Sequence, residues 1–241
     1  MKYAELSGIK IALGNRERLL ALSKSLVGKG GVIFTPNPYI MYLAKKSEAY
    51  EKTLSFASLN IPDGIGLVYL LRLMGYSTDA FPGVELAESL LPGNSFAVIG
   101  GKEGVAKRAA VRLVKEYRTG ECKFCFSGYG IDENEIKAAL KEHQPTLCLV
   151  CLGAPKQEFF IERIKAASPK TLFLALGGAV DVYAGDIRRA PKIFRRAHLE
   201  WLWRTVSAPI RISRLCSSAY YVLCEFFSVL NKKSTARDRK T

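Results

Sequence analysis

The chain has 241 residues, of which 49% are hydrophobic and 24% charged, and its formal net charge is +14. This composition excludes a disordered protein, and the length suits one large α/β domain or a core with an appendage. The positive charge gathers in residues 188–241, which hold 13 Lys and Arg residues against 3 Asp and Glu residues. Such a basic segment indicates nucleic acid, an anionic membrane surface or a phosphorylated substrate as its partner.

In the first half of the chain, apolar runs alternate with amphipathic segments and with turns rich in glycine and proline. They predict helices at residues 15–27, 39–46, 66–75 and 84–91, and strands at residues 32–34 and 56–61. In the second half, strands are predicted at residues 95–99, 123–127, 147–152 and 172–176, and helices at residues 105–117, 133–142 and 155–166. This alternation is typical of βαβ units, so we expect an α/β fold with a Rossmann-like parallel sheet flanked by helices.

A different kind of segment follows this core, which we place at residues 1–194. Residues 195–231 mix apolar and aromatic side chains, among them Trp201 and Trp203, with several arginines. The mixture favours a basic, amphipathic helical appendage that docks on a membrane surface. The alternative is an ordinary amphipathic helix packed on the domain. Residues 232–241 are polar and predict a frayed tail.

The chain shows no sign of a targeting or membrane-spanning segment. Its N-terminus lacks the continuous apolar run of a signal peptide. No stretch reaches the roughly 18 uncharged apolar residues that a spanning helix needs. We therefore expect a cytoplasmic protein whose thiols stay reduced.

Four of the six cysteines form two C-x-x-C motifs, at residues 122–125 and 148–151. Both motifs fall on predicted strands, where residues i and i+3 point to opposite faces. Neither pair is then able to chelate one ion, so we expect no zinc site and interpret these cysteines as small hydrophobic residues.

Two glycine turns follow predicted strands, one at Gly153 and one at Gly177-Gly178. Open α/β sheets bind ligands at the carboxyl ends of their strands. Polar groups and cations suited to phosphate lie nearby in the sequence: Gln157, Glu158, Asp181, Asp186, Lys156, Arg188 and Arg189. We expect a nucleotide-type ligand here; the alternative is that the glycines only cap helices and the charges are solvated.

Nine short motifs occur in order along the chain: TPNP (35–38), PDGIG (62–66), RxxG (72–75), PGVEL (82–86), IGGKEGVA (99–106), LGAPKQE (152–158), GGAVDVYAG (177–185), RAP (189–191) and LEWLWR (199–204). Together they resemble the WecG/TagA/CpsF glycosyltransferases (glycosyltransferase family 26) over about residues 8–215. Members of that family transfer a sugar from a UDP-sugar to a lipid-diphosphate-linked sugar in the synthesis of bacterial cell-surface polymers.

The resemblance implies an inverting transfer of an N-acetylhexosamine, here N-acetylmannosamine, from its UDP form. The implied acceptor is undecaprenyl-diphosphate-linked N-acetylglucosamine, in teichoic acid or polysaccharide synthesis. In this family an aspartate at the position of Asp63 is the base, with the equivalents of Thr35, Asn37 and Gln157 in the same pocket. The alternative for Asp63 is a helix N-cap before Gly64.

The resemblance also implies which residues contact the two substrates. The expected donor-binding residues lie in or beside glycine turns, which suit a diphosphate at helix N-termini: Gly100, Gly101, Lys102, Gly153, Ala154, Pro155, Lys156, Glu158 and Gly178. Arg204, Arg211 and Arg214 are assigned to the diphosphate and membrane side of the site. No metal ion or cofactor is implied.

The chain departs from the family pattern at a few positions. Ala80 stands where the family often has an arginine, which removes a cation near the diphosphate, and Glu85 replaces an aspartate. In the tail, Ala208 begins the Ala-Pro-Ile-Arg that stands in place of Glu-Pro-x-Arg.

Two other functions remain open at this stage. One is the same fold acting on another UDP-hexose, and the other is a non-catalytic module that binds a nucleotide or RNA. The cations lie in an apolar, tryptophan-rich tail, which argues against nucleic acid as the partner. We expect a peripheral protein on the inner face of the bacterial cell membrane; whether it forms a homo-oligomer is left open.

Overall fold

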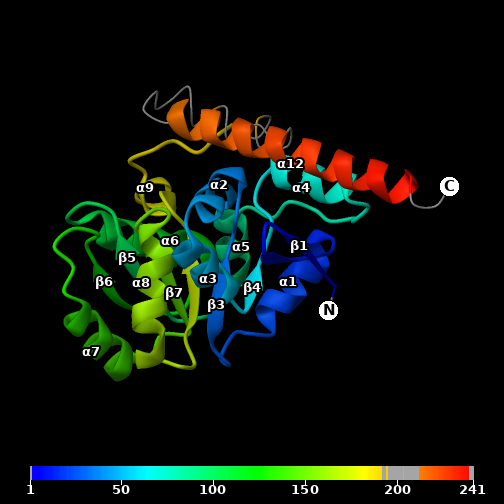
Figure 1. Cartoon of the computed structure of the whole chain (residues 1–241). Helices are drawn as coiled ribbons and strands as arrows, with labels where there is room; N and C mark the ends of the chain where they lie inside the picture. Colours follow the sequence, from blue (N-terminus) through cyan, green and yellow to red (C-terminus); the bar gives the residue numbers. More distant parts are fainter. Residues whose placement is uncertain (1, 192–193, 195–202, 204–211, 239–241) are drawn as a thin grey trace.

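The protein is built on a parallel sheet of six strands, and the computed structural model describes residues 2–191, 194, 203 and 212–238 (Figure 1). The spatial order of the strands is β4-β3-β8-β7-β5-β6. Their bounds are Gly31–Phe34 for β3, Leu59–Asn60 for β4, Phe96–Gly100 for β5, Cys122–Phe126 for β6, Leu147–Cys151 for β7 and Leu172–Ala175 for β8. The inner strands are almost wholly apolar because both faces of the sheet are covered. The predicted Rossmann-like α/β fold is confirmed.

Helices cover the two faces of the sheet in separate layers. The α6 face carries α1 (Arg16–Lys24), α5 (Gly83–Leu90), α6 (Val105–Tyr117) and α9 (Ala179–Ala184). The α8 face carries α2 (Pro38–Lys46), α3 (Glu48–Ser55), α4 (Ile65–Leu73), α7 (Glu133–His143) and α8 (Lys156–Ile164), which runs into a short 3-10 helix at Lys165–Ala167. Alternate residues of a strand serve the two cores: Leu172 and Leu174 pack on the α6 face, whereas Phe173 packs on the α8 face.

Two strands and two helices of the described structure were not predicted. Strands β1 (Tyr3–Leu6) and β2 (Ile9–Ala12) form an antiparallel hairpin around Ser7 and Gly8, both of which have positive φ. The sequence did carry this signal, since a Ser-Gly pair lies between two alternating segments. Helices α3 and α9 were also missed; α3 is mostly polar and α9 is only six residues long.

The expectation that each cysteine pair lies on opposite faces is wrong for one of the two. Cys122 and Cys125 both pack on the α6 face, and their sulfur atoms lie 3.4 Å apart. The register of β6 against β5 shifts at this point, because Cys122 pairs with Phe96 while Phe124 pairs with the next residue, Ala97. The extra residue, Lys123, reverses the alternation that the prediction assumed. The expectation holds for Cys148 and Cys151, which pack on the α8 and α6 faces respectively.

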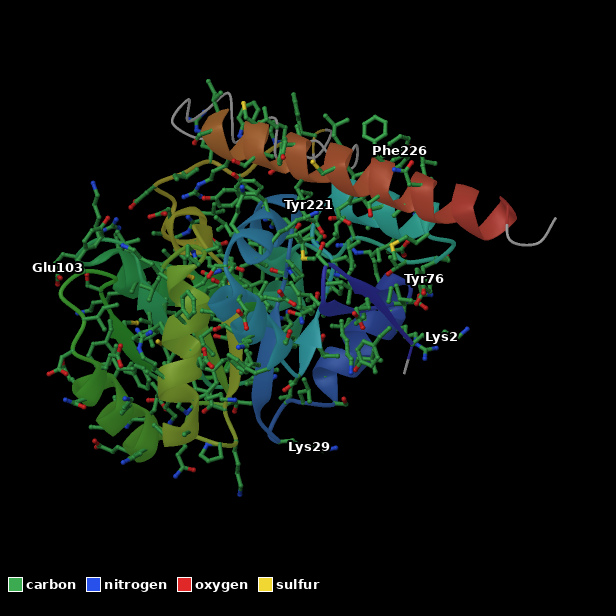
Figure 2. All side chains as sticks on the ribbon, in the orientation of Figure 1. Lys2, Lys29, Tyr76, Glu103, Tyr221 and Phe226 are labelled. Atoms are coloured by element: carbon green, nitrogen blue, oxygen red, sulfur yellow. The ribbon has the colours of Figure 1, made fainter. Side chains whose placement is uncertain are left out.

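The last described helix, α12 (Ile212–Asp238), crosses one end of the molecule and lies against α2 and α4 (Figure 1). Its Tyr221 is 1% exposed, belongs to the α8-face core and shares a 2.9 Å hydrogen bond with Ser7 (Figure 2). The helix continues to Asp238, although the polar residues from 232 onward predicted a frayed tail. Lysine, arginine and alanine in this stretch are good helix formers, so polarity alone does not end a helix.

The appendage is only partly described. Trp203 lies 5.5 Å from Phe194 between ring centroids, whereas Trp201, Arg204 and Arg211 are outside the described residues. Among the residues that the structure describes, no helix is both long and apolar enough to cross a membrane.

Candidate active site

Two loops at the carboxyl edge of the sheet carry the expected catalytic residues. The loop after β3 contains Thr35 and Asn37, and the loop after β4 contains Asp63. Two backbone hydrogen bonds hold them side by side: the N–H of Ile61 donates to Phe34 O at 2.9 Å, and the N–H of Asp63 donates to Pro36 O at 2.8 Å. The fold therefore brings Asp63 next to the Thr35–Asn37 segment, as the resemblance implied.

Asn37 and Asp63 occupy different positions relative to the helices that follow them. Asn37 caps α2, since its side-chain oxygen accepts a hydrogen bond from the N–H of Ile40 at 3.1 Å. The N-cap position of α4 is taken by Gly64, the residue after Asp63. Gly64 has φ of 90°, a conformation that favours glycine. Asp63 therefore lies one residue before the N-cap position that the alternative gave it.

A third segment, residues 80–83, packs beside these two loops. The N–H of Phe81 donates to Pro62 O at 2.9 Å, and a Cβ added to Gly83 would lie 2.7 Å from Thr35 Oγ1. The neighbouring Ala80 is buried. A cation nevertheless lies next to this segment, because the guanidinium of Arg16 is 4.7 Å from the centre of the Phe81 ring.

The charged side chains near residues 80–83 are largely paired with one another. Glu85, at the position where the family has aspartate, forms an ion pair with Arg16. Arg189 lies 2.6 Å from Glu88 and 3.8 Å from Glu85. Arg188 and Arg189 line a cavity of about 340 Å³ between α5, α6 and α9, not the carboxyl edge of the sheet. Asp186 pairs with Arg108 at 2.6 Å.

The glycine turn after β5 is packed tightly against its neighbours. Gly100 and Gly101 have φ of 145° and 73°, and a Cβ on Gly100 would collide with the carbonyl oxygen of Cys151. The N–H of Gly128, which follows β6, donates to Gly101 O at 2.8 Å. Lys102 is exposed just before α6. The turn thus opens α6 with an exposed cation at its start.

Gln157 joins the turns that follow β7 and β8. Its side-chain oxygen accepts hydrogen bonds from the N–H of Gly153 at 3.2 Å and from the N–H of Gly177 at 2.8 Å. Its side-chain nitrogen donates to Glu158 at 2.8 Å. With 3% of its surface exposed, Gln157 holds both turns from within the protein. The sequence placed Gln157 at the site but gave no sign of these contacts.

Glu158 lies behind Gln157 in the interior and is 1% exposed. Burial raises its pKa, and the hydrogen bond from Gln157 opposes that shift only in part. Burial also raises the pKa of Tyr50, and a charge on Glu158 raises it further. Neither the Tyr50 hydroxyl nor the second carboxyl oxygen of Glu158 has a well-formed hydrogen bond among the described residues.

The remaining expected substrate residues fall into two groups. Those at the glycine turns are at least partly accessible: Gly153, Ala154, Pro155, Lys156 and Gly178. From the appendage, Arg214 lies close to the Asn37 loop, because its guanidinium is 5.3 Å from the centre of the Tyr39 ring, two residues after Asn37. Nothing in the sequence pointed to Tyr39. Within the described part of the chain, no group of three or more His, Cys, Asp and Glu side chains is placed to hold a metal ion.

Comparison with known proteins identifies the family of the chain. The family model of the glycosyl transferase WecG/TagA/CpsF family matches residues 4–237. The chain belongs to this family. It is 34% identical over 200 residues to a protein of Bacillus spizizenii (80% of this chain, 78% of the relative) and 31% identical over 211 residues to one of Bacillus subtilis (85% and 82%). A Staphylococcus aureus relative is 29% identical over 191 residues (77% and 75%).

All three relatives carry one name, N-acetylglucosaminyldiphosphoundecaprenol N-acetyl-beta-D-mannosaminyltransferase. The matched region of this WecG/TagA/CpsF family member includes the loops after β3 and β4, the glycine turns after β5 and β7, and most of α12.

Proposed function

We propose that this glycosyltransferase moves N-acetylmannosamine from UDP-N-acetylmannosamine to undecaprenyl-diphosphate-linked N-acetylglucosamine, in the synthesis of a cell-surface polymer. The placement of Asp63 beside Thr35 and Asn37 at the carboxyl edge of the sheet carries the proposal. The names of the relatives support the choice of donor and acceptor.

In the proposed reaction, Asp63 takes the proton from the attacking hydroxyl of the acceptor sugar. The acceptor oxygen forms a bond to the anomeric carbon as the bond from that carbon to the diphosphate breaks, and UDP leaves. Thr35 and Asn37 lie beside Asp63 and orient the reacting groups. A positioned base of this kind contributes about 10²–10⁴-fold in rate.

The donor diphosphate has a natural place at the two glycine turns. The turn at Gly100 and Gly101 opens α6, and the turn at Gly153 opens α8, so both present helix N-termini to an anion. Lys102 and Lys156 are exposed at these starts and supply cations for the leaving group. Gln157 and Glu158 act from beneath by holding the turns.

The acceptor is anchored in a bilayer, and α12 has a surface suited to that neighbourhood. The outer stripe of α12 consists of exposed apolar residues that share one face of the helix: Ile212, Tyr220, Leu223, Phe227 and Leu230. Arg214 lies on the opposite side of the same helix, which faces the domain, beside Tyr39 of α2. We propose that the stripe rests in the membrane interface, with Arg204, Arg211 and Arg214 toward the lipid diphosphate.

This arrangement gives the proposed division of the chain a functional meaning. Residues 1–194 form the catalytic core and residues 195–231 the membrane-docking appendage. The protein then works as a peripheral protein on the cytoplasmic face of the cell membrane, where both substrates meet.

The decisive experiment compares Asp63→Asn with the wild type in transfer to a short-chain lipid-diphosphate N-acetylglucosamine acceptor. Products from a panel of UDP-sugars are identified by mass spectrometry, and UDP binding is measured by calorimetry. We expect UDP-N-acetylmannosamine to be the preferred donor, and the variant to lose 10²–10⁴-fold in turnover, on the order of one general base, while still binding UDP.

Asp132→Asn is the matched control, because Asp132 caps α7, is not part of the proposed site, and asparagine is an equally good cap. Near-normal turnover by Asp63→Asn would refute the assigned base. Preference for another UDP-hexose would refute the donor. RNA binding without liposome binding would favour the non-catalytic alternative.

A further inference from the structure

Two cysteines outside the proposed reaction lie in contact on strand β6. The sulfur atoms of Cys122 and Cys125 are 3.4 Å apart, and both side chains are half-buried. Nothing in the proposed transfer uses either thiol.

The contact depends on the irregular backbone of β6. The extra residue at Lys123 turns both cysteines toward the α6 face, where a regular strand would separate them. β6 is also the outermost strand of the sheet and pairs with β5 alone. An edge strand with a bulge has room to adjust locally without breaking pairs inside the sheet.

The two thiols are chemically unequal. A hydrogen bond from the Cys122 thiol, together with the positive charge of Lys107, lowers the pKa of Cys125, although burial opposes this shift. The same hydrogen bond and burial raise the pKa of Cys122. Cys125 therefore has the more thiolate character, and Cys122 stands next to it as a second thiol. Low-pKa, accessible cysteines beside a resolving cysteine are typical of redox-sensitive sites.

The other buried pair provides a contrast within the same sheet. Cys148 and Cys151 are fully buried on opposite faces, and burial raises the pKa of both thiols, that of Cys151 to about 12. These two cysteines have neither the contact nor the ionisation that exchange chemistry needs.

We propose that Cys122 and Cys125 form a reversible dithiol–disulfide site that reacts with low-molecular-weight disulfides. In the first step the Cys125 thiolate attacks one sulfur of the oxidant and releases one thiol, which leaves a mixed disulfide on Cys125. The Cys122 thiolate then attacks the Cys125 sulfur and releases the second thiol. The protein dithiol loses two protons and two electrons, and the oxidant is reduced to two thiols. Closure brings the sulfurs from 3.4 Å to a bond of about 2.05 Å.

The test treats the full-length reduced protein with oxidised glutathione, quenches it in acid and alkylates the remaining thiols under denaturing conditions. Trypsin cleaves after Arg118, Lys123 and Lys137, so the disulfide would join two peptides, residues 119–123 and 124–137, each with one cysteine. We expect this cross-linked pair in the mass spectrum, the loss of alkylation at both Cys122 and Cys125, and recovery of both thiols with dithiothreitol.

Single variants separate the two steps. Cys122→Ser should keep glutathione on Cys125 as a stable adduct, because the resolving thiol is missing. Cys125→Ser should react at least about tenfold more slowly at residue 122, because its thiol is the less ionised one. Exposed Cys216 serves as an internal control in every sample, since it forms a mixed disulfide whenever the oxidant is active.

Two results would overturn the proposal. One is wild-type protein that carries glutathione on Cys125 without the cross-linked peptide. The other is full alkylation of Cys122 and Cys125 in samples where Cys216 has reacted.

Discussion

Gln157 and Gly177 are joined across two neighbouring strand ends by a 2.8 Å hydrogen bond, from the Gly177 N–H to the side-chain oxygen of Gln157. The same oxygen also accepts a hydrogen bond from the N–H of Gly153, which begins the turn that leads into α8. One amide group thereby fixes the spacing of two turns that come from strands 20 residues apart in sequence. The proposed donor site depends on that spacing.

Replacing Gln157 with Ala should loosen both turns. Two partly buried N–H groups would lose their acceptor, and each would cost at most the roughly 1–3 kcal/mol of a fully buried unsatisfied group. We expect a lower midpoint in urea unfolding and a large loss of transfer activity. Lys156→Ala is the control, because Lys156 is exposed one residue earlier, and it should keep the wild-type stability. Equal stability of the two variants would contradict the role assigned to Gln157.

Glu158 should make the stability of the protein depend on pH in a particular direction. Its pKa is raised above 4.5 by burial, so the folded state holds the proton more tightly than the unfolded state. The stabilisation is fully present below about pH 4.5 and is lost as the pH rises through the raised pKa. Glu158→Gln keeps a neutral side chain, so its advantage in free energy of unfolding over the wild type should grow as the pH rises above 4.5, the usual pKa of the carboxyl. Parallel pH profiles for the two proteins would rule this out.

The two faces of α12 should respond in opposite ways to substitution by alanine. Tyr221 is fully buried, and Tyr221→Ala should cost about 3–5 kcal/mol of stability, as for other large aromatic side chains. Phe227 is 59% exposed on the outer stripe, and Phe227→Ala should stay within about 0.5 kcal/mol of the wild type. Chemical unfolding measures both changes.

The same variant tests the membrane role of the outer stripe. Phe227→Ala should bind anionic liposomes about tenfold more weakly, because burying a phenyl group is worth about 1.5–3 kcal/mol. Unchanged sedimentation with liposomes would argue against the stripe as the docking surface.

Gly83→Ala should impair catalysis more than folding. Its new Cβ would meet Thr35 Oγ1 at 2.7 Å, and Thr35 is a stiff, buried side chain. We expect a loss of turnover larger than any change in KM for the donor, with a stability cost of about 1–3 kcal/mol. Ser89→Ala, at the other end of α5, is the control and should leave turnover intact.

Metal content remains a prediction of the sequence. We expect no stoichiometric zinc in protein purified without added metal, because Cys148 and Cys151 face opposite cores and the Cys122–Cys125 pair gathers no third ligand among the described residues. Elemental analysis checks this, and one zinc per chain that is lost in Cys125→Ser would contradict it.

The six strands of the parallel sheet could be predicted because each is a largely apolar run followed by a glycine or proline turn. Their spatial order could not, because periodicity reports which residues are buried and not which strands are neighbours. For the same reason the sequence placed Gln157 at the site without revealing its bond to Gly177. That bond exists only because β7 and β8 are adjacent.

Two other contacts could not be predicted from the sequence, each for its own reason. A bulge leaves no mark in the residue pattern, so the meeting of Cys122 and Cys125 was invisible. Arg16 lies far from Phe81 in sequence, and only the tertiary fold places this cation beside the Phe81 ring. Motifs located the loops, whereas the contacts between the loops required the structure.

The order of the strands also governs how the chain must be assembled. β3 receives its partner β8 only after some 140 further residues have been made, and α2 and α4 are covered only once α12 has followed. Such non-local pairing is slow, because distant segments must meet before they are stabilised. A nascent chain leaving the ribosome will therefore expose the apolar sides of α2 and α4 until α12 has been made. Proteolytic removal of α12 would expose these apolar surfaces again, so we expect protein cut before Ile212 to aggregate and to be bound by chaperones.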